Sequence, residues 1–134
     1  MSETITDSPV ALDDLVERIA AQAFDSRIFT VYTNTKRAQT RAVKGHYPHL
    51  VVVGKVSQRV EIVGMIETAG TLHNLEAAAR RWQALEPLQA AIYLYVPRGY
   101  CADARTLCLR EHIHISDFRH YWFDDGLHVH KCFA

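Results

Sequence analysis

The sequence predicts an α/β fold in which a mixed central β-sheet is flanked by helices in the order αβββαβαβ, followed by a C-terminal hairpin. Three observations support this class. Residues 45–68 contain two β-rich apolar segments on either side of the turn-forming residues 54–58, which predicts a hairpin. A helical pattern of apolar residues precedes them. In the second half, strand-like and helical segments alternate, which indicates right-handed parallel crossovers.

The individual elements follow from local signals. Ser8 and Pro9 form a helix start, and apolar residues then recur at helical spacing as far as Ala23. The solvent side of this helix is predicted to carry four charged residues, Asp13, Asp14, Glu17 and Arg18. Strands are predicted at residues 27–33, 49–53, 60–68, 89–96 and 112–116, and helices at 72–85 and 101–111. Residues 120–134 are expected to form the last hairpin, with its turn at Asp125-Gly126.

The composition is typical of one globular domain spanning residues 1–134, with residues 1–7 expected to be disordered. The 15 basic and 15 acidic side chains cancel, so nucleic-acid binding has to come from a local patch. No apolar run approaches the ~20 residues of a membrane helix, and no signal peptide is indicated. We therefore expect no membrane partner.

The three cysteines, Cys101, Cys108 and Cys132, are odd in number and share no CxxC spacing. This pattern favours free thiols in a reducing compartment over a disulfide framework. The predicted location is the cytoplasm. No GxSxG, GxxxxGK[ST] or GxGxxG motif occurs in the sequence, so neither a serine nucleophile nor a phosphate-binding loop is indicated.

The predicted hairpin at residues 45–68 resembles a known superfamily. Pro48 is followed by one residue, an apolar strand, a turn and a strand that ends Gly-Met-Ile-Glu-Thr. This pattern resembles the core hairpin of the PD-(D/E)XK nucleases, whose fold is the restriction-endonuclease-like one. In that superfamily an aspartate follows the proline, and the next strand carries an acid, any residue and a lysine. Here His49 stands at the aspartate, Met65 at the second acid and Glu67 at the lysine, so the resemblance implies this fold with a degenerate site.

The replacements remove both carboxylates that hold Mg²⁺ in the superfamily. A hard cation prefers carboxylate and water oxygens, which imidazole and thioether groups replace poorly. Glu61 lies roughly 13 Å from Met65 along the strand, at about 3.3 Å per residue, and cannot substitute. In the superfamily the first helix often donates a further acid, and Glu17 is the candidate here; a solvated surface glutamate is the alternative. No catalytic residue, metal ligand or cofactor is therefore assigned.

A basic segment leads into the hairpin. It carries four cations within nine residues and no acid: Lys36, Arg37, Arg41 and Lys44. Beside a nuclease-like hairpin, these side chains would bind the phosphates of DNA or RNA. The alternative interpretation is a solvated loop or an edge strand, where lysine prevents aggregation.

Histidines are abundant near the end of the chain, at His112, His114, His120, His128 and His130. On the predicted last strand His128, His130 and Cys132 alternate onto one face, and His112 or His114 would complete a zinc site. Steps of ~6.6 Å between successive ligands on a strand are long for a metal site. Histidines on a polar sheet face are therefore the favoured interpretation.

Three functional hypotheses follow. The leading one is a catalytically impaired PD-(D/E)XK-like protein that acts as a nucleic-acid-binding or assembly module. The second is an active nuclease with migrated ligands, in which Glu67, His49 and Glu17 surround Mn²⁺ or Zn²⁺. The third is a structural homodimer or partner subunit whose interface is the aromatic tail, Phe118, Tyr121, Trp122 and Phe123.

Overall fold

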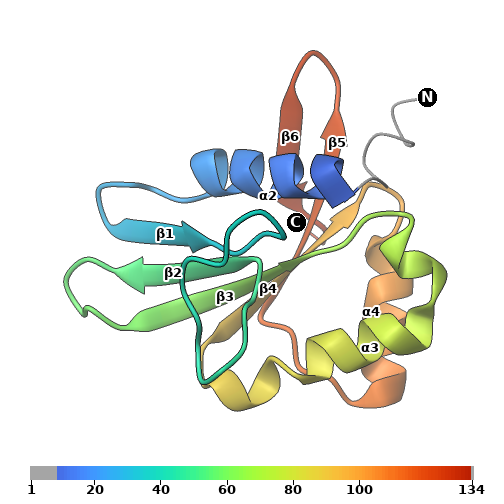
Figure 1. Ribbon diagram of the computed structural model, residues 1–134. Helices are drawn as coiled ribbons and strands as arrows, with labels where there is room; N and C mark the ends of the chain where they lie inside the picture. Colours follow the sequence, from blue (N-terminus) through green and yellow to red (C-terminus); the bar gives the residue numbers. More distant parts are fainter. Residues whose placement is uncertain (1–8, 134) are drawn as a thin grey trace.

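A curled, mixed β-sheet of six strands runs through the computed structural model, which describes residues 9–133 and places three α-helices around the sheet (Figure 1). The predicted α/β class with a mixed sheet is therefore confirmed. The elements in chain order are α2 (Pro9–Ala23), β1 (Phe29–Thr33), β2 (Leu50–Gly54), β3 (Val60–Ile66), η1 (Thr71–His73), α3 (Leu75–Gln83), η2 (Glu86–Leu88), β4 (Ala91–Pro97), α4 (Cys101–Glu111), β5 (Asp117–Phe123) and β6 (Leu127–Lys131).

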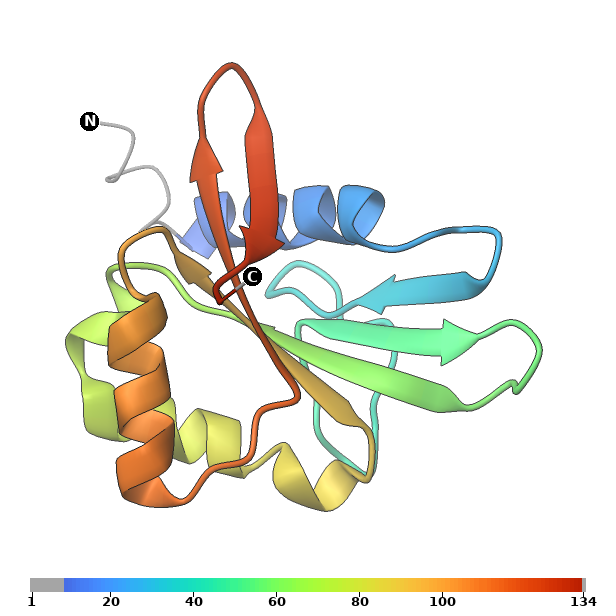
Figure 2. The same ribbon diagram turned by 180° about the vertical axis from the view of Figure 1, so that it is seen from behind.

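The strands lie in the sheet in the order in which they occur along the chain. β1, β2 and β3 form an antiparallel meander, β4 and β5 run parallel to β3, and β6 returns antiparallel to β5. Parallel neighbours need crossover connections, which α3 and α4 provide. Both of these helices pack on one face of the sheet and α2 packs on the other (Figure 2).

Two clusters of buried side chains hold the layers together. On the α3–α4 face, Trp82 and Leu107 belong to the same cluster as Val51 of β2. On the α2 face, Ile19 clusters with Leu50, the neighbouring residue of the same strand. Because successive side chains of a strand point to opposite faces, β2 contributes to both clusters and is buried along its whole length.

The helices lie close to their predicted positions, and α4 has the predicted bounds. The helix predicted at residues 72–85 is divided into η1 and α3 by Asn74, whose side chain accepts a hydrogen bond from Ala77 N at 3.1 Å. Across residues 9–133, no helix is long and apolar enough to cross a membrane. The start signal at Ser8 and the expected disorder of residues 1–7 lie outside the described residues.

The prediction of a strand at residues 112–116 is wrong. This segment is an irregular connection in which Ile113 and Ile115 are buried. Its backbone is bonded to several elements: Ile113 N donates to a carbonyl in the last turn of α4, His114 N donates to the Glu86 carboxylate at 3.0 Å, and Ser116 N donates to Ile92 O of β4 at 2.9 Å. β5, the next strand of the main sheet, is instead the first strand of the predicted C-terminal hairpin.

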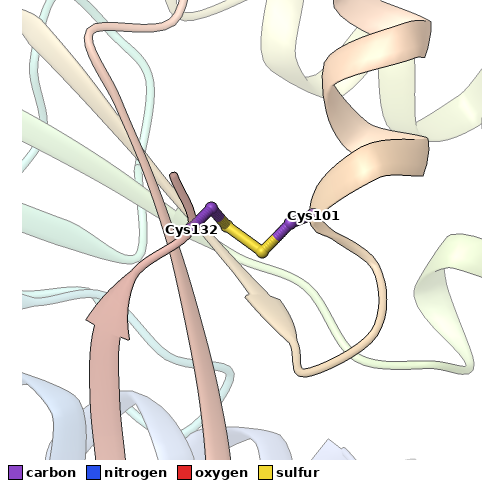
Figure 3. The surroundings of a disulfide bond; sticks show 2 residues. All are labelled: Cys101 and Cys132. Atoms are coloured by element: carbon purple, nitrogen blue, oxygen red, sulfur yellow. A yellow bond between two sulfur atoms is a disulfide. The ribbon is translucent and has the colours of Figure 1, made fainter. Parts of the chain in front are cut away.

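The prediction of three free thiols is also wrong, because Cys101 and Cys132 form a disulfide (Figure 3). Cys101 begins α4 and Cys132 follows β6, so the bond joins segments 31 residues apart in the sequence. Cys108 is free and buried, and burial raises the pKa of its thiol to about 11. With Cys132 in a disulfide, the zinc ligand set of His128, His130 and Cys132 loses its thiolate.

Candidate functional site

The positions of the degenerate motif lie where β2 begins and β3 ends. Leu50 pairs with Gly64, and the next residues at this end of the two strands are His49 and Met65. Glu67 directly follows β3. The hairpin register thus brings these positions to the same end of the two strands, but their side chains have different surroundings.

Glu67 is a buried carboxylate with four hydrogen-bond donors. Its side chain is 1% exposed. Oε1 accepts from Thr71 Oγ1 at 2.7 Å and from Arg81 Nη2 at 2.6 Å, and Oε2 accepts from Arg81 Nε at 3.2 Å and from Trp82 Nε1 at 2.9 Å. A buried charge is tolerated when it is paired and hydrogen-bonded in this way. The Glu67 carboxylate therefore links η1 and α3 to the end of β3 through hydrogen bonds.

His49 is half-buried and hydrogen-bonded to the neighbouring strand. Its Nδ1 accepts from Ile66 N at 2.9 Å, so the proton of the neutral ring is on Nε2. Burial lowers the pKa of His49, the Glu67 carboxylate opposes this shift, and the Arg81 guanidinium adds to it. His49 thus serves as a neutral acceptor that joins β2 to the end of β3.

Met65, the third motif residue, is half-buried and packs against the core cluster on the α3–α4 face. It shares this cluster with Val63, two residues before it on β3. A thioether in this position adds apolar contact. Of the three motif residues, His49 lines an open pocket.

This pocket has a volume of about 180 Å³ and lies between the start of α2 and the connection from β1 to β2. Its lining residues are Leu12, Asp13, Asn34, Thr35, Lys36, Gln39, Tyr47 and His49. The acid that the first helix contributes is Asp13, which was predicted to face solvent but is 3% exposed. Its carboxylate accepts from Lys36 N at 3.1 Å and from Arg37 N at 3.2 Å.

Glu17, the candidate chosen from the sequence, lies elsewhere. It is exposed, and its Oε2 accepts from Thr33 Oγ1 at 2.9 Å. The sequence did contain a pattern that indicates the burial of Asp13: the apolar residues Val16 and Ala20 follow it at helical spacings of three and seven, which places all three on one side of the helix. In the structure both Val16 and Ala20 contribute to the α2-side cluster. Asp13 therefore borders the apolar stripe of α2.

The basic connection between β1 and β2 is held in place by the buried side chain of Asn34. Its Nδ2 donates to Arg41 O and to Pro48 O, both at 2.7 Å. Its Oδ1 accepts from Thr40 N at 2.8 Å and from Arg41 N at 2.9 Å. One amide thus fills two donor and two acceptor positions and fixes a long loop that has few backbone pairs of its own.

The four cations of this connection have different partners. Arg37 is ion-paired with Asp14 at 2.8 Å and with Asp13 at 3.4 Å. Lys44 Nζ donates to Gln89 Oε1 at 2.7 Å. The remaining two are Lys36, which is exposed and lines the pocket, and Arg41, whose guanidinium lies 5.0 Å from the centroid of the Tyr32 ring. Among the described residues, Lys36 and Arg41 are therefore the two cations of the connection whose charged groups make neither an ion pair nor a hydrogen bond, and we call them the least compensated.

Comparisons with known proteins add no assignment: no family model, curated protein or solved structure matches the chain. Between residues 9 and 133, no group of three or more histidine, cysteine, aspartate or glutamate side chains is placed to hold a metal ion. The arrangement offers a small polar pocket beside a fixed basic loop.

The half-buried imidazole of His49 makes stability depend on pH. Its pKa is lowered in the folded protein, so below the ordinary histidine value of about 6.5 the unfolded chain binds the proton more readily. The contribution of His49 is fully present above that value and is lost as the pH falls from it through the lowered pKa of the folded protein. We expect His49→Asn, which keeps an acceptor for Ile66 N, to reduce the fall in unfolding free energy between about pH 7.5 and 5.5. Urea titrations at both pH values measure this difference.

The control for this experiment is His73→Asn, because His73 is exposed. We expect it to leave the pH dependence of the wild type unchanged. Equal pH dependence in the wild type and in His49→Asn would show that folding does not lower the pKa of His49.

Proposed function

We propose that this protein is a nucleic-acid-binding or assembly module with a restriction-endonuclease-like fold that does not use metal-dependent cleavage. The element order α2-β1-β2-β3-α3-β4 is the feature of the fold that supports this part of the proposal. The observation that carries the proposal is the state of the motif residues. The Glu67 carboxylate is saturated by internal donors, and His49 accepts from the backbone of β3.

Nucleic-acid binding is supported by the basic connection beside these residues. Asn34 and Asp13 hold it in a defined conformation, so its cations are presented without a further cost of ordering the loop. Lys36 and Arg41 carry the least compensated charge, and Arg37 and Lys44 contribute at the two ends. Contacts of this kind bind the phosphate backbone with little sequence preference.

The two alternatives receive less support from the observed contacts. An active nuclease with Mn²⁺ or Zn²⁺ needs a free carboxylate at Glu67, whereas each oxygen of that group already accepts two hydrogen bonds. A homodimer through the aromatic tail needs Tyr121 at the surface, whereas Tyr121 is buried and its hydroxyl donates to Glu67 O at 2.7 Å.

The cytoplasmic location expected from the cysteines stays a prediction. The Cys101–Cys132 bond removes the argument from free thiols on which it rested, because structural disulfides are typical of oxidising compartments.

Charge reversal at the two least compensated cations tests the proposed function. We expect Lys36→Glu together with Arg41→Glu to weaken binding of a short oligonucleotide by about tenfold or more. The slope of log K against log salt is expected to decrease by about two, because two phosphate contacts are lost. Fluorescence anisotropy at several salt concentrations measures both quantities.

The matched control reverses two exposed cations near the β2–β3 turn, Lys55→Glu with Arg59→Glu. It makes the same change in net charge and is expected to retain most of the affinity and the wild-type salt slope. If both double variants bind like the wild type, the basic connection does not bind nucleic acid. Equal losses in both would indicate an effect of net charge alone.

A further inference from the structure

The β5–β6 hairpin carries a row of planar side chains around Trp122. Trp122 of β5 pairs with His128 of β6, and His120 pairs with His130. The Trp122 ring is stacked with the rings of His128 and His130, each at a centroid distance of 5.2 Å, with interplanar angles of 13° and 21°. The His120 ring lies 5.3 Å from the same indole. Three imidazoles thus surround one tryptophan.

This row lies on the face of the hairpin that is turned away from α2. Tyr121 and Val129 point into the α2-side cluster, so the alternation of the strands turns Trp122, His128 and His130 to the other side. Figure 2 shows the hairpin projecting beyond the rest of the sheet, with α2 behind it and none of the described helices in front of its tip. The row is accessible, because His130 is exposed and Trp122 is only half-buried.

One permanent positive charge belongs to this face. The Arg98 guanidinium, from the connection between β4 and α4, lies 4.5 Å from the centroid of the Trp122 ring. The acids beside the row are Asp124 and Asp125 in the hairpin turn, and the backbone carbonyl of Asp124 is bonded to His128 Nε2 at 2.9 Å. The charged groups that act on His120 in this row are His130 and Arg98.

The charge of the face depends on pH. Each imidazole that gains a proton adds one positive charge to that of Arg98. Burial lowers the pKa of His120, and His130 and Arg98 lower it further. A bound anion would act in the opposite direction and raise the pKa of His120. Anion binding and proton uptake on this face are therefore coupled.

We propose that the hairpin cluster, formed by Arg98, His120, Trp122, His128 and His130, binds single-stranded nucleic acid and that its affinity rises as the pH falls. This inference rests on the proposed function and adds to it the kind of strand, a second surface and a dependence on pH. It differs from the basic connection around Lys36, whose four charged side chains are lysines and arginines rather than histidines.

The chemistry of the hairpin cluster favours single strands. Unpaired bases stack on tryptophan, histidine and arginine planes, whereas a duplex keeps the faces of its bases inside the helix. Guanidinium and imidazolium groups donate charge-assisted hydrogen bonds to phosphate oxygens. A single strand offers both the bases and the phosphates to the same narrow, projecting surface.

Titration with a labelled oligothymidylate of about 12 nucleotides tests the inference at about pH 8 and about pH 6. We expect the wild type to bind about tenfold more tightly at the lower pH, with quenching of intrinsic fluorescence. Trp82 is fully buried, so the quenching reports Trp122 and is expected to be lost in Trp122→Phe. The variant His128→Gln with His130→Gln is expected to weaken binding at pH 8 and to lose most of the increase at pH 6, because it removes both stacking planes and both titratable groups of β6.

The matched control is His73→Gln with His114→Gln, which removes two exposed histidines elsewhere and is expected to keep the full increase. Circular dichroism at both pH values establishes that every variant is folded. A wild type that binds equally at both pH values, or an increase that persists in the β6 variant, would refute the hairpin surface and leave the proposed function intact. No binding at either pH refutes both proposals, and equal affinity for a duplex of the same length refutes the preference for single strands.

Discussion

Replacing Cys101 and Cys132 by serine is expected to lower the free energy of unfolding by about 3.5 kcal/mol. The disulfide joins residues 31 apart and so restricts the unfolded chain. In the chain-entropy relation a loop of about 15 residues contributes about 3 kcal/mol, and longer loops contribute more. For a domain of this size the loss corresponds to a Tm lower by roughly 10 °C. Thermal unfolding followed by circular dichroism measures the change.

The reductant dithiothreitol supplies the control for this prediction. It is expected to lower the Tm of the wild type to about that of the double serine variant and to leave the variant unchanged. Thiol titration of the unfolded wild type is expected to find Cys108 alone before reduction and all three cysteines after it. A reductant effect of equal size on both proteins would mean that the Tm difference does not come from this bond.

The substitution Glu67→Ala is expected to cost about 3 kcal/mol of unfolding free energy, because it leaves a cavity and a buried Trp82 N–H without an acceptor, while Arg81, which is 37% exposed, can be hydrated. Arg81, Trp82 and Thr71 all lose their acceptor on this carboxylate. Since small domains are stable by about 5 to 15 kcal/mol, this single change removes a large fraction of the stability. Urea unfolding of the purified variant measures the loss.

A matched control lies on the same helix as Arg81. Glu76 and Arg80 are both exposed and 3.8 Å apart, so Glu76→Ala is expected to change the unfolding free energy by less than about 0.5 kcal/mol. A double-mutant cycle of Glu67→Ala and Arg81→Ala separates the pair from its other contacts. A loss below about 1 kcal/mol in Glu67→Ala would mean that the carboxylate is not buried as described.

The parts of the fold that sequence analysis predicted well are those fixed by local patterns. α4 has the predicted bounds because Pro97 and Gly99 mark a turn, which separates the helical pattern of apolar residues in α4 from the continuous apolar run of β4. Residues 112–116 were mispredicted by the same reasoning. Two buried isoleucines alternate there with exposed histidines, as in a strand, but Ile113 N and His114 N bond to α4 and η2, and only Ser116 N bonds to a strand, at Ile92 O. A periodic pattern does not identify which groups a backbone will pair with.

The candidate site was predicted less completely, because its contacts join distant segments. Asp13 became buried only because the backbone N–H groups of Lys36 and Arg37, more than 20 residues away, donate to it. The disulfide likewise depends on the crossover that brings the start of α4 beside the end of β6. Cysteine count and spacing carry no information on that crossover, and so they favoured free thiols.

The order of the strands in the sheet has a consequence for how the chain acquires its structure. Every strand neighbours in space the strands that precede and follow it in the chain, so the sheet can grow by adding one strand at a time to an open edge. No strand has to be inserted between two others that are already paired. Short separations between pairing partners reduce the entropy cost of loop closure and favour rapid folding. The first and last strands, β1 and β6, form the two edges of the sheet. We expect the backbone hydrogen bonds of these two strands to open first in local unfolding.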